Sequence, residues 1–137
     1  MNSNKIYNHL KNYSEGDGVY LENPCSIDKI NELQTKLNDK VNGIFVNEYS
    51  NFLETTNGAQ IENAVFYSDK EFLDKVENSN RFEIGYAGNM DAYLYNVTTK
   101  KYEITNFFNT AEVFESFDSL TDLMNRVLEV QGVTKSA

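Results

Sequence analysis

VNEYSNFLETTNGAQIENAVFY, residues 46–67, decides the fold, because it joins a helix to the start of a sheet. We expect Asn47 to cap the helix and Asn57-Gly58 to end it, since glycine readily takes the left-handed conformation found after many helices. The apolar run at residues 64–67 is too short for a helix and is typical of a strand. One side of the helix holds residues that recur at helical spacing, namely Val46, Tyr49, Phe52, Leu53 and Thr56.

Two further helices are predicted upstream. Residues 4–13 carry a narrow apolar stripe formed by Ile6, Leu10 and Tyr13. A longer helix follows, with Ser26 as its cap and Asp28 in the first turn, where the helix dipole favours an acid. We expect Asn42-Gly43 to end it. Its apolar face consists of Ile27, Ile30, Leu33, Leu37 and Val41.

The region after residue 67 begins with a short helix and then changes to strand patterns. Ser68 and Glu71 form a capping box, in which each side chain can accept from the other's backbone N–H. Residues 91–97 and 102–105 predict an antiparallel hairpin, and 112–115 a short edge strand. A half-buried strand comes before them, with Phe82, Ile84 and Tyr86 alternating with Glu83 and Gly85.

A closing helix has the strongest periodic pattern in the chain. We expect Ser116 or Asp118 to cap it and Gly132 to end it. Its apolar residues are Leu120, Leu123, Met124, Val127 and Leu128. Helices first, strands in the middle and a helix last predict an α+β fold, with a mostly antiparallel sheet flanked by helices. At 137 residues we expect one domain, with a core at about 20–131 and a tail at 132–137.

Composition narrows the functional classes. The net charge of −9 and the scattered Lys and Arg argue against direct nucleic-acid binding. No apolar run approaches the roughly 18 residues that a membrane span needs, and the N-terminus lacks the apolar middle of a signal peptide. We therefore expect a cytoplasmic protein without a membrane partner. The acidic charge could steer it toward a basic partner, and is equally typical of an acidic protein without one.

No pattern indicates catalysis. His9 and Cys25 are the only residues of their types, so the chain cannot build the usual zinc site from Cys and His. A Cys/His nucleophilic pair has no local support, and lone Cys25 allows no internal disulfide. Carboxylates are plentiful, but hydrolysis requires two at a defined separation in a cleft. We expect no catalytic residue, no metal and no cofactor.

Tyrosines gather around the predicted hairpin and suggest a binding surface. Tyrosine is favoured at interfaces because it combines a large ring with a hydroxyl at low entropy cost. Alternate tyrosines on a strand are equally typical of a sheet core. The nearby acids Glu112 and Glu115 could face a basic partner, or be the solvated side of the last elements. The candidate hairpin residues are Tyr86, Asn89, Asp91, Tyr93 and Tyr95.

The order of motifs over residues 27–128 resembles the SUKH superfamily, the Smi/Knr-like group. Its pattern is an aromatic helix ending in Asn-Gly, a strand with an aromatic pair, an Ile-Gly strand, a Gly/Asp turn, a Y-x-Y-x-x-x-T hairpin and a closing S-F-x-x-L helix. The matching residues are Tyr49, Phe52, Leu53, Asn57, Gly58, Phe66, Tyr67, Ile84, Gly85, Gly88, Asp91, Tyr93, Tyr95, Thr99, Ser116, Phe117 and Leu120. The chain departs from this pattern at Val46-Asn47, at Ala59 and in having no tryptophan.

The resemblance implies a non-enzymatic intracellular binding protein. Bacterial members are similar to antidotes that neutralise a toxin domain, often a nuclease or deaminase, by covering its active site. An acidic antidote suits a basic toxin. We expect a monomer or weak dimer with a protein partner. The alternatives are a regulatory or scaffolding module in cell-wall or signalling assemblies, and a small hydrolase that uses acids in a cleft.

Overall fold

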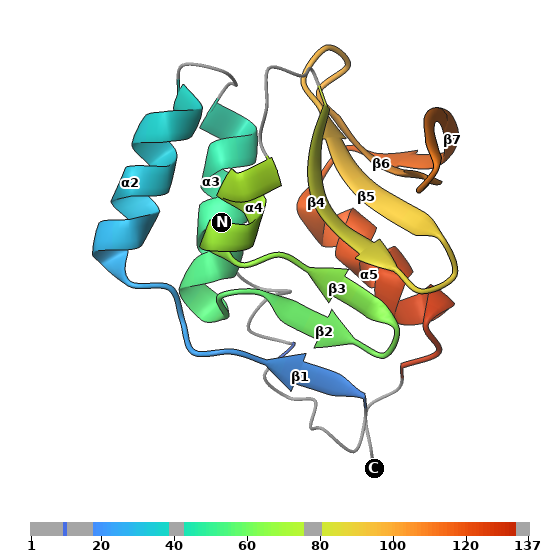
Figure 1. Ribbon diagram of the computed structural model, residues 1–137, viewed down its shortest axis with the longest axis horizontal. Helices are drawn as coiled ribbons and strands as arrows, with labels where there is room; N and C mark the ends of the chain where they lie inside the picture. The colour runs from blue at the N-terminus through green and yellow to red at the C-terminus, as the bar shows by residue number, and fades with distance from the viewer. Residues whose placement is uncertain (1–9, 11–17, 39–42, 76–80, 134–137) are drawn as a thin grey trace.

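The computed structural model describes residues 10, 18–38, 43–75 and 81–133. They form one antiparallel sheet of seven strands and four helices, which confirms the α+β class (Figure 1). The strands are β1 Val19–Leu21, β2 Ala59–Ile61, β3 Ala64–Phe66, β4 Arg81–Ala87, β5 Asp91–Asn96, β6 Lys101–Asn106 and β7 Asn109–Phe117. The helices are α2 Ile27–Asn38, α3 Gly43–Thr55, α4 Asp69–Lys75 and α5 Leu120–Val130.

The sheet is a meander in which each strand pairs with the next one along the chain. Short connections between strands favour this arrangement, because sequential antiparallel strands need only a tight turn. α2 and α3 are inserted between β1 and β2, and α4 lies between β3 and β4. The strands β1 and β7 therefore form the two edges of the sheet.

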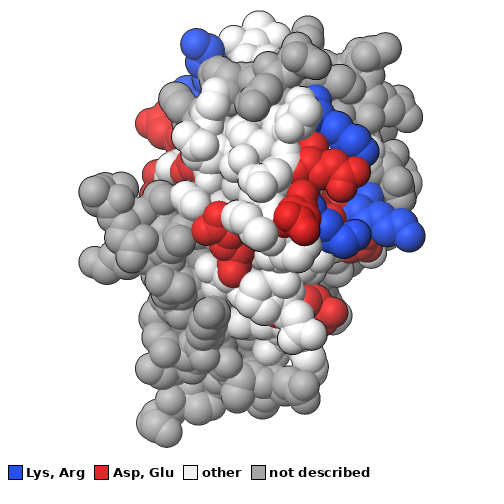
Figure 2. Space-filling view, turned by 90° about the vertical axis from the view of Figure 1, so that its left-hand side faces the viewer, with Lys and Arg blue, Asp and Glu red and all other residues white. Residues whose placement is uncertain are grey.

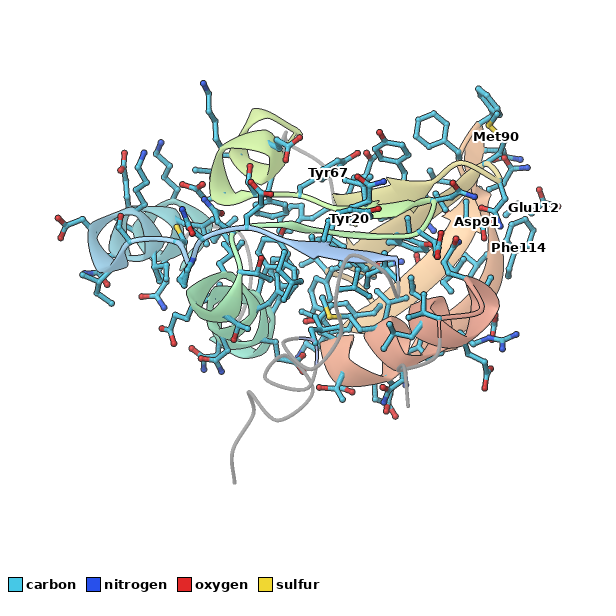
Figure 3. The ribbon with its side chains drawn as sticks, turned by 90° about the horizontal axis from the view of Figure 1, so that it is seen from below. Tyr20, Tyr67, Met90, Asp91, Glu112 and Phe114 are labelled. Atoms are coloured by element: carbon cyan, nitrogen blue, oxygen red, sulfur yellow. The ribbon has the colours of Figure 1, made fainter. Side chains whose placement is uncertain are left out.

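The strand register places two rows of side chains on opposite faces of the sheet. Residues directly opposite each other on paired strands share a face, and neighbours along a strand do not. α3 and α5 lie on the same side of the sheet (Figure 3), which we call the inner face. Its row across all seven strands is Leu21, Ala59, Phe66, Gly85, Tyr93, Ile104 and Glu115. The outer-face row is Tyr20, Gln60, Val65, Tyr86, Ala92, Thr105 and Val113.

Phe45 lies at the centre of the aromatic core. Its ring stacks on Tyr95 at 4.6 Å between centroids and on Tyr49 at 5.6 Å. Three more rings contact it at tilted angles, those of Phe72, Phe82 and Tyr102. The start expected for this helix, at a cap on Asn47, is wrong, because α3 begins at Gly43. Phe45, Tyr49 and Phe52 are spaced i, i+4 and i+7, so burying Phe45 extends the apolar face of the helix backwards.

The junction after α3 holds the helix layer to the sheet, as residues 46–67 predict. Tyr49 Oη donates to the Tyr67 carbonyl at 2.5 Å. Asn57 and Asp69 exchange two hydrogen bonds of 2.9 Å each. Gly58 has φ +95°, and a Cβ there would lie 3.0 Å from the Ser68 nitrogen. A glycine is therefore needed at Gly58 for both conformation and space.

The structure confirms one predicted cap and corrects the other. Ser68 N donates to Glu71 Oε1 at 3.1 Å, and Glu71 N donates to Ser68 Oγ at 3.2 Å. In contrast, neither Ser116 nor Asp118 caps α5. Ser119 does so, accepting from Asp122 N at 3.1 Å. The reason is that β7 is longer than predicted and keeps residue 116 within the strand.

Other boundaries also differ from the prediction. Ile27 is 63% exposed, contrary to the prediction, whereas Ile30, Leu33 and Leu37 are buried as expected. Val133, expected in the tail, is buried, and its N–H donates to the Leu128 carbonyl at 3.0 Å. The core also includes Leu10 and Val19, before residue 20. The helix predicted at 4–13 and the position of Val41 otherwise lie outside the described residues.

Candidate protein-binding surface

A bulge in β4 turns Tyr86 to the outer face. The pairing with β5 shifts between Glu83 and Gly85, so Phe82 pairs with Tyr95 and Gly85 pairs with Tyr93. The two tyrosines are two residues apart on β5 and share a face, so Phe82 and Gly85 share it too. Tyr86 is therefore on the opposite face from Phe82, which contradicts the simple alternation that was predicted. It is 38% exposed.

The rings of Tyr86 and Phe107 contact each other across β5 on the outer face. Their ring centroids are 6.1 Å apart, although they come from either side of that strand. Tyr86 lies on β4 and Phe107 directly follows β6, so the contact between their rings spans the intervening strand β5. Ala92 pairs with Tyr86 and is fully buried, although it is not part of the inner core. The two aromatic rings explain how this outer-face position loses its contact with water.

Six of the nine large hydrophobic residues that are exposed in the described chain gather at this end of the sheet. The backbone joins the two turns that carry them, since Phe107 N donates to the Met90 carbonyl at 2.8 Å. Figure 3 shows Met90 and Phe114 at the same end of the molecule. Phe108 is 77% exposed and contacts Phe107 edge to face at 5.4 Å. We call Tyr86, Met90, Phe107, Phe108 and Val113 the outer aromatic patch, because aromatic rings dominate it.

Two acids, Asp91 and Glu112, lie at the same end of the sheet as this patch (Figure 3), but Asp91 is on the opposite face. The sequence has no Lys or Arg at 82–99 or at 102–125. Asp91 precedes Ala92 on β5, so its side chain shares the inner face with Tyr93. Within the described residues neither Asp91 nor Glu112 forms an ion pair. Glu112 accepts from Asn106 Nδ2 at 2.8 Å. On the side of the molecule that carries α2, by contrast, basic side chains lie directly beside acidic ones (Figure 2).

Two acids on the outer face, Glu83 and Glu103, are paired within the protein. Tyr67 donates a hydrogen bond to Glu83, and its ring lies 6.0 Å from that of Tyr86. Burial, followed by this hydrogen bond, raises the pKa of Tyr67 above its usual range, so the hydroxyl keeps its proton. Arg81 Nη2 donates to Glu103 Oε1 at 2.6 Å. Glu83 and Glu103 are thus both engaged within the protein.

The structure brings together only some of the residues predicted to bind a partner. Tyr86 belongs to the patch, and Asn89 lies in the turn beside it. Asp91 is half-exposed on the inner face, and Glu112 accepts a hydrogen bond from Asn106, which shares that face. Tyr93 and Tyr95 are 2% and 1% exposed and belong to the core, so their prediction as partner-binding residues is wrong. Their spacing on the inner face of β5 is the reason. Glu115 is on the inner face as well, where it pairs with Arg126 Nε at 3.1 Å.

Sequence reasoning missed most of the apolar members of the patch. These are Met90, Phe107, Phe108 and Val113. One signal was available: Phe107 and Phe108 are consecutive and lie between Asn106 and Asn109, which are turn-forming residues. Two adjacent aromatic residues in a turn point in different directions, so both cannot enter one core. The remaining predicted motif residues, Gly85 and Gly88, have structural roles in β4 and in the turn after it.

Catalytic and metal-binding arrangements were also sought in the described residues. Among them, no three His, Cys, Asp or Glu side chains are placed to hold a metal ion. Cys25 is buried, and burial, together with Asp69, raises the pKa of its thiol. His9 lies outside the described residues. A groove of about 470 Å³ over the outer face of β1–β3 is lined by Tyr20, Glu22, Asn23, Pro24, Asn57, Gly58, Ala59, Gln60, Val65, Phe66, Ser68 and Glu71.

Glu48 is a carboxylate with a structural position. It accepts from Tyr102 Oη at 2.8 Å and from Leu120 N at 3.3 Å, which links α3 to β6 and to the start of α5. Burial raises its pKa, and these two hydrogen bonds act in the opposite direction. It does not line the groove over β1–β3. Its geometry therefore stabilises the junction of three elements.

No protein-family model matches the chain, and no curated protein is significantly similar to it. The resemblance to the SUKH superfamily therefore stays a prediction. The α+β class is common to many unrelated functions, so function has to be argued from the surface. None of the helices within the described residues combines the length and the apolar character that crossing a bilayer requires.

Proposed function

We propose that this protein is an immunity protein of the SUKH type, which neutralises a toxin domain inside a bacterial cell by binding it. The observation that carries the proposal is the outer aromatic patch. Isolated exposed hydrophobic residues are common, but a contiguous group bordered by polar residues is typical of a protein-interaction site. The ordered SUKH-like motifs supply the class of partner. In this proposal the protein carries out no reaction itself.

Inhibition would follow from occupation of the toxin's active site. A nuclease or a nucleic-acid deaminase needs a basic surface to hold its substrate. A chain of net charge −9 complements such a surface and speeds the encounter. The apolar patch then supplies the short-range contacts that slow dissociation.

The test is a toxicity assay in the native gene context. The proposal predicts that a toxin-type domain is encoded next to this chain, and that domain is expressed in a sensitive host, alone and together with the chain. We expect growth to be arrested by the toxin domain and restored by co-expression. In a purified system, an equimolar amount of the chain should abolish the toxin domain's activity on its nucleic-acid substrate.

A matched control tests whether growth is restored by specific binding to the toxin domain. An unrelated toxin domain of the same enzymatic class should remain active in the presence of the chain, because specific neutralisation depends on complementary surfaces. If the neighbouring toxin domain stays fully active with the chain in micromolar excess, the proposal is wrong.

A further inference from the structure

The groove over β1–β3 is a second feature of the outer face, and it adjoins the outer aromatic patch. Its floor is the outer side of the sheet at Tyr20, Gln60 and Val65. The short helix α4 lies on this side, opposite α3 and α5 (Figure 3). Val65 pairs with Tyr86 of the patch, so the groove and the patch are neighbours on one surface. A partner that covers the patch can therefore reach the groove as well.

Two walls of the groove are fixed to the junction after α3. In the wall that follows β1, Glu22 N donates to Thr56 Oγ1 at 2.8 Å. The same wall accepts at the Asn23 carbonyl, to which Asn57 N donates at 3.0 Å. The wall at the start of α4 is held by the two hydrogen bonds between Asn57 and Asp69. The groove is thus formed before any partner binds, so little order has to be gained on binding.

The described residues that line the groove carry two negative charges and no positive one. The two acids are Glu22 and Glu71, one from each wall, and none of the lining residues is Lys, Arg or His. Within the described chain neither acid takes part in an ion pair. An anionic ligand would meet like charges here, whereas a cation would gain attraction without displacing an existing ion pair.

The shape of the groove and its tyrosine narrow the choice of cation. Tyr20 lines the groove together with Glu22 and is 42% exposed. A planar guanidinium can stack on such a ring and also form paired hydrogen bonds with a carboxylate, which an ammonium group cannot. Six of the lining residues are exposed, so the groove is open to solvent. Small-molecule sites bury roughly 70–90% of their ligand, so an open groove suits a segment of protein chain better.

We propose that the groove over β1–β3 docks an arginine-bearing segment of a partner protein. In this complex the guanidinium lies on the ring of Tyr20, and its charge faces Glu22 and Glu71. The identification of the partner as a toxin domain rests on the proposed function, in which a nuclease or deaminase carries basic side chains on its substrate-binding surface. The chemistry of the groove does not depend on that identification, so the two can be tested apart.

The first experiment uses a defined probe. The isotope-labelled full chain is titrated with a 12-residue Gly/Ser peptide that carries three arginines, and separately with the same peptide in which citrulline replaces arginine. We expect the arginine peptide to shift the NMR signals of amides 20–24, 57–60 and 68–71, and the citrulline peptide, which lacks the charge, to leave them unchanged. Salt should weaken the response, because exposed charges are screened. Equal responses to both peptides, or shifts centred elsewhere, would overturn the proposal.

Dilution of the free chain tests a different occupant of the groove. We expect the signals of the same amides to stay constant when the concentration of the unliganded chain is changed. If they shift with concentration, a second copy of the chain occupies the groove, and the proposal is overturned.

The second experiment measures the Kd of the arginine peptide for three variants. Glu22→Gln with Glu71→Gln removes both charges, while glutamine still serves in the capping box, and should raise Kd about tenfold. Tyr20→Leu removes the ring and should raise Kd about threefold. The control, Glu32→Gln with Glu112→Gln, changes the net charge equally on α2 and β7, outside the groove, and should leave Kd unchanged. Thermal unfolding confirms that each variant folds. An unchanged Kd in the first variant would overturn the proposal.

Binding of the neighbouring toxin domain separates the two proposals. If the toxin domain does not bind the unmodified chain, the proposed function fails, and the peptide experiments alone decide the groove. If it binds the unmodified chain and the groove variants equally well, the groove proposal is overturned and the proposed function stands. Phe107→Ser with Phe108→Ser, which alters the patch alone, should weaken binding of the toxin domain and leave the Kd of the arginine peptide unchanged. A loss of peptide binding in that variant would place the peptide on the patch and overturn the groove proposal.

Discussion

Gly85 shows how one residue sets the approach of two strands. It pairs with both Phe66 on β3 and Tyr93 on β5. A Cβ at this position would lie well inside 3.0 Å of the Val65 carbonyl oxygen, which belongs to backbone and cannot turn aside. Only glycine therefore allows β3 and β4 to approach as they do.

We predict that Gly85→Ala lowers the free energy of unfolding by about 2–4 kcal/mol, because the sheet must shift to admit the methyl group. Gly88→Ala is the matched control. The nearest atom to a Cβ there is 3.6 Å away, an ordinary contact, so a change below about 1 kcal/mol is expected. Urea unfolding followed by circular dichroism measures both. Equal losses in the two variants would contradict this explanation.

We predict opposite effects on stability when valine replaces two buried threonines, Thr105 and Thr56. Thr105 Oγ1 is buried and has no hydrogen-bond partner among the described residues, whereas Thr56 Oγ1 accepts from Glu22 N at 2.8 Å and donates to the Gly58 carbonyl at 2.5 Å. Thr105→Val should leave stability unchanged or raise it, since the valine has the same shape without the polar atom. Thr56→Val should cost about 1–3 kcal/mol. Thermal unfolding of the pair tests this, and a loss in Thr105→Val would show that its hydroxyl is paired.

At the scale of elements, Glu48 is the clearest link between separate segments. It connects α3 to Tyr102 on β6 and to the first turn of α5. Because burial raises its pKa above the ordinary value of 4.5, folding favours the protonated form. The contribution of this group to stability is therefore complete below 4.5 and is lost as pH rises through the raised pKa.

We predict that Glu48→Gln changes the pH dependence of stability. The advantage of the unmodified chain over the variant should shrink as pH rises through the raised pKa of Glu48, because only the unmodified chain has a partly buried carboxylate to ionise. Glu54→Gln, on the exposed side of the same helix, should show no such trend. Urea unfolding at stepped pH values measures both differences. A difference that stays constant with pH would rule out burial as the cause.

For some of these elements, local sequence patterns are sufficient to predict the structure. The capping box at Ser68, the apolar face of α2 from Ile30 onward and the whole buried face of α5 follow from spacing alone. The start of α3 and the cap of α5 do not. Each depends on how far the neighbouring segment continues, and that is settled by packing around Phe45 and by the pairing of β7 with β6.

At the scale of the whole molecule, the core and the outer aromatic patch divide the aromatic residues between two tasks. Phe45 is fully buried and contacts five rings, whereas Phe108 projects into solvent. We predict that Phe45→Ala costs about 3–5 kcal/mol of stability and that Phe108→Ala changes it by less than about 0.5 kcal/mol. Calorimetry of both variants is the measurement. A large loss for Phe108→Ala would show that the patch supports the fold.

The amino-acid pattern by itself determined the fold class, most of the helices, the capping box and the joint at residues 46–67. These features depend on neighbours within a few positions, so their causes are visible in the chain. The tertiary structure alone decided which side Tyr86 faces, since one bulged residue reverses every later position on β4. It also decided that Tyr93 and Tyr95 lie inside while Phe107 and Phe108 lie outside, because that depends on which face α3 and α5 cover.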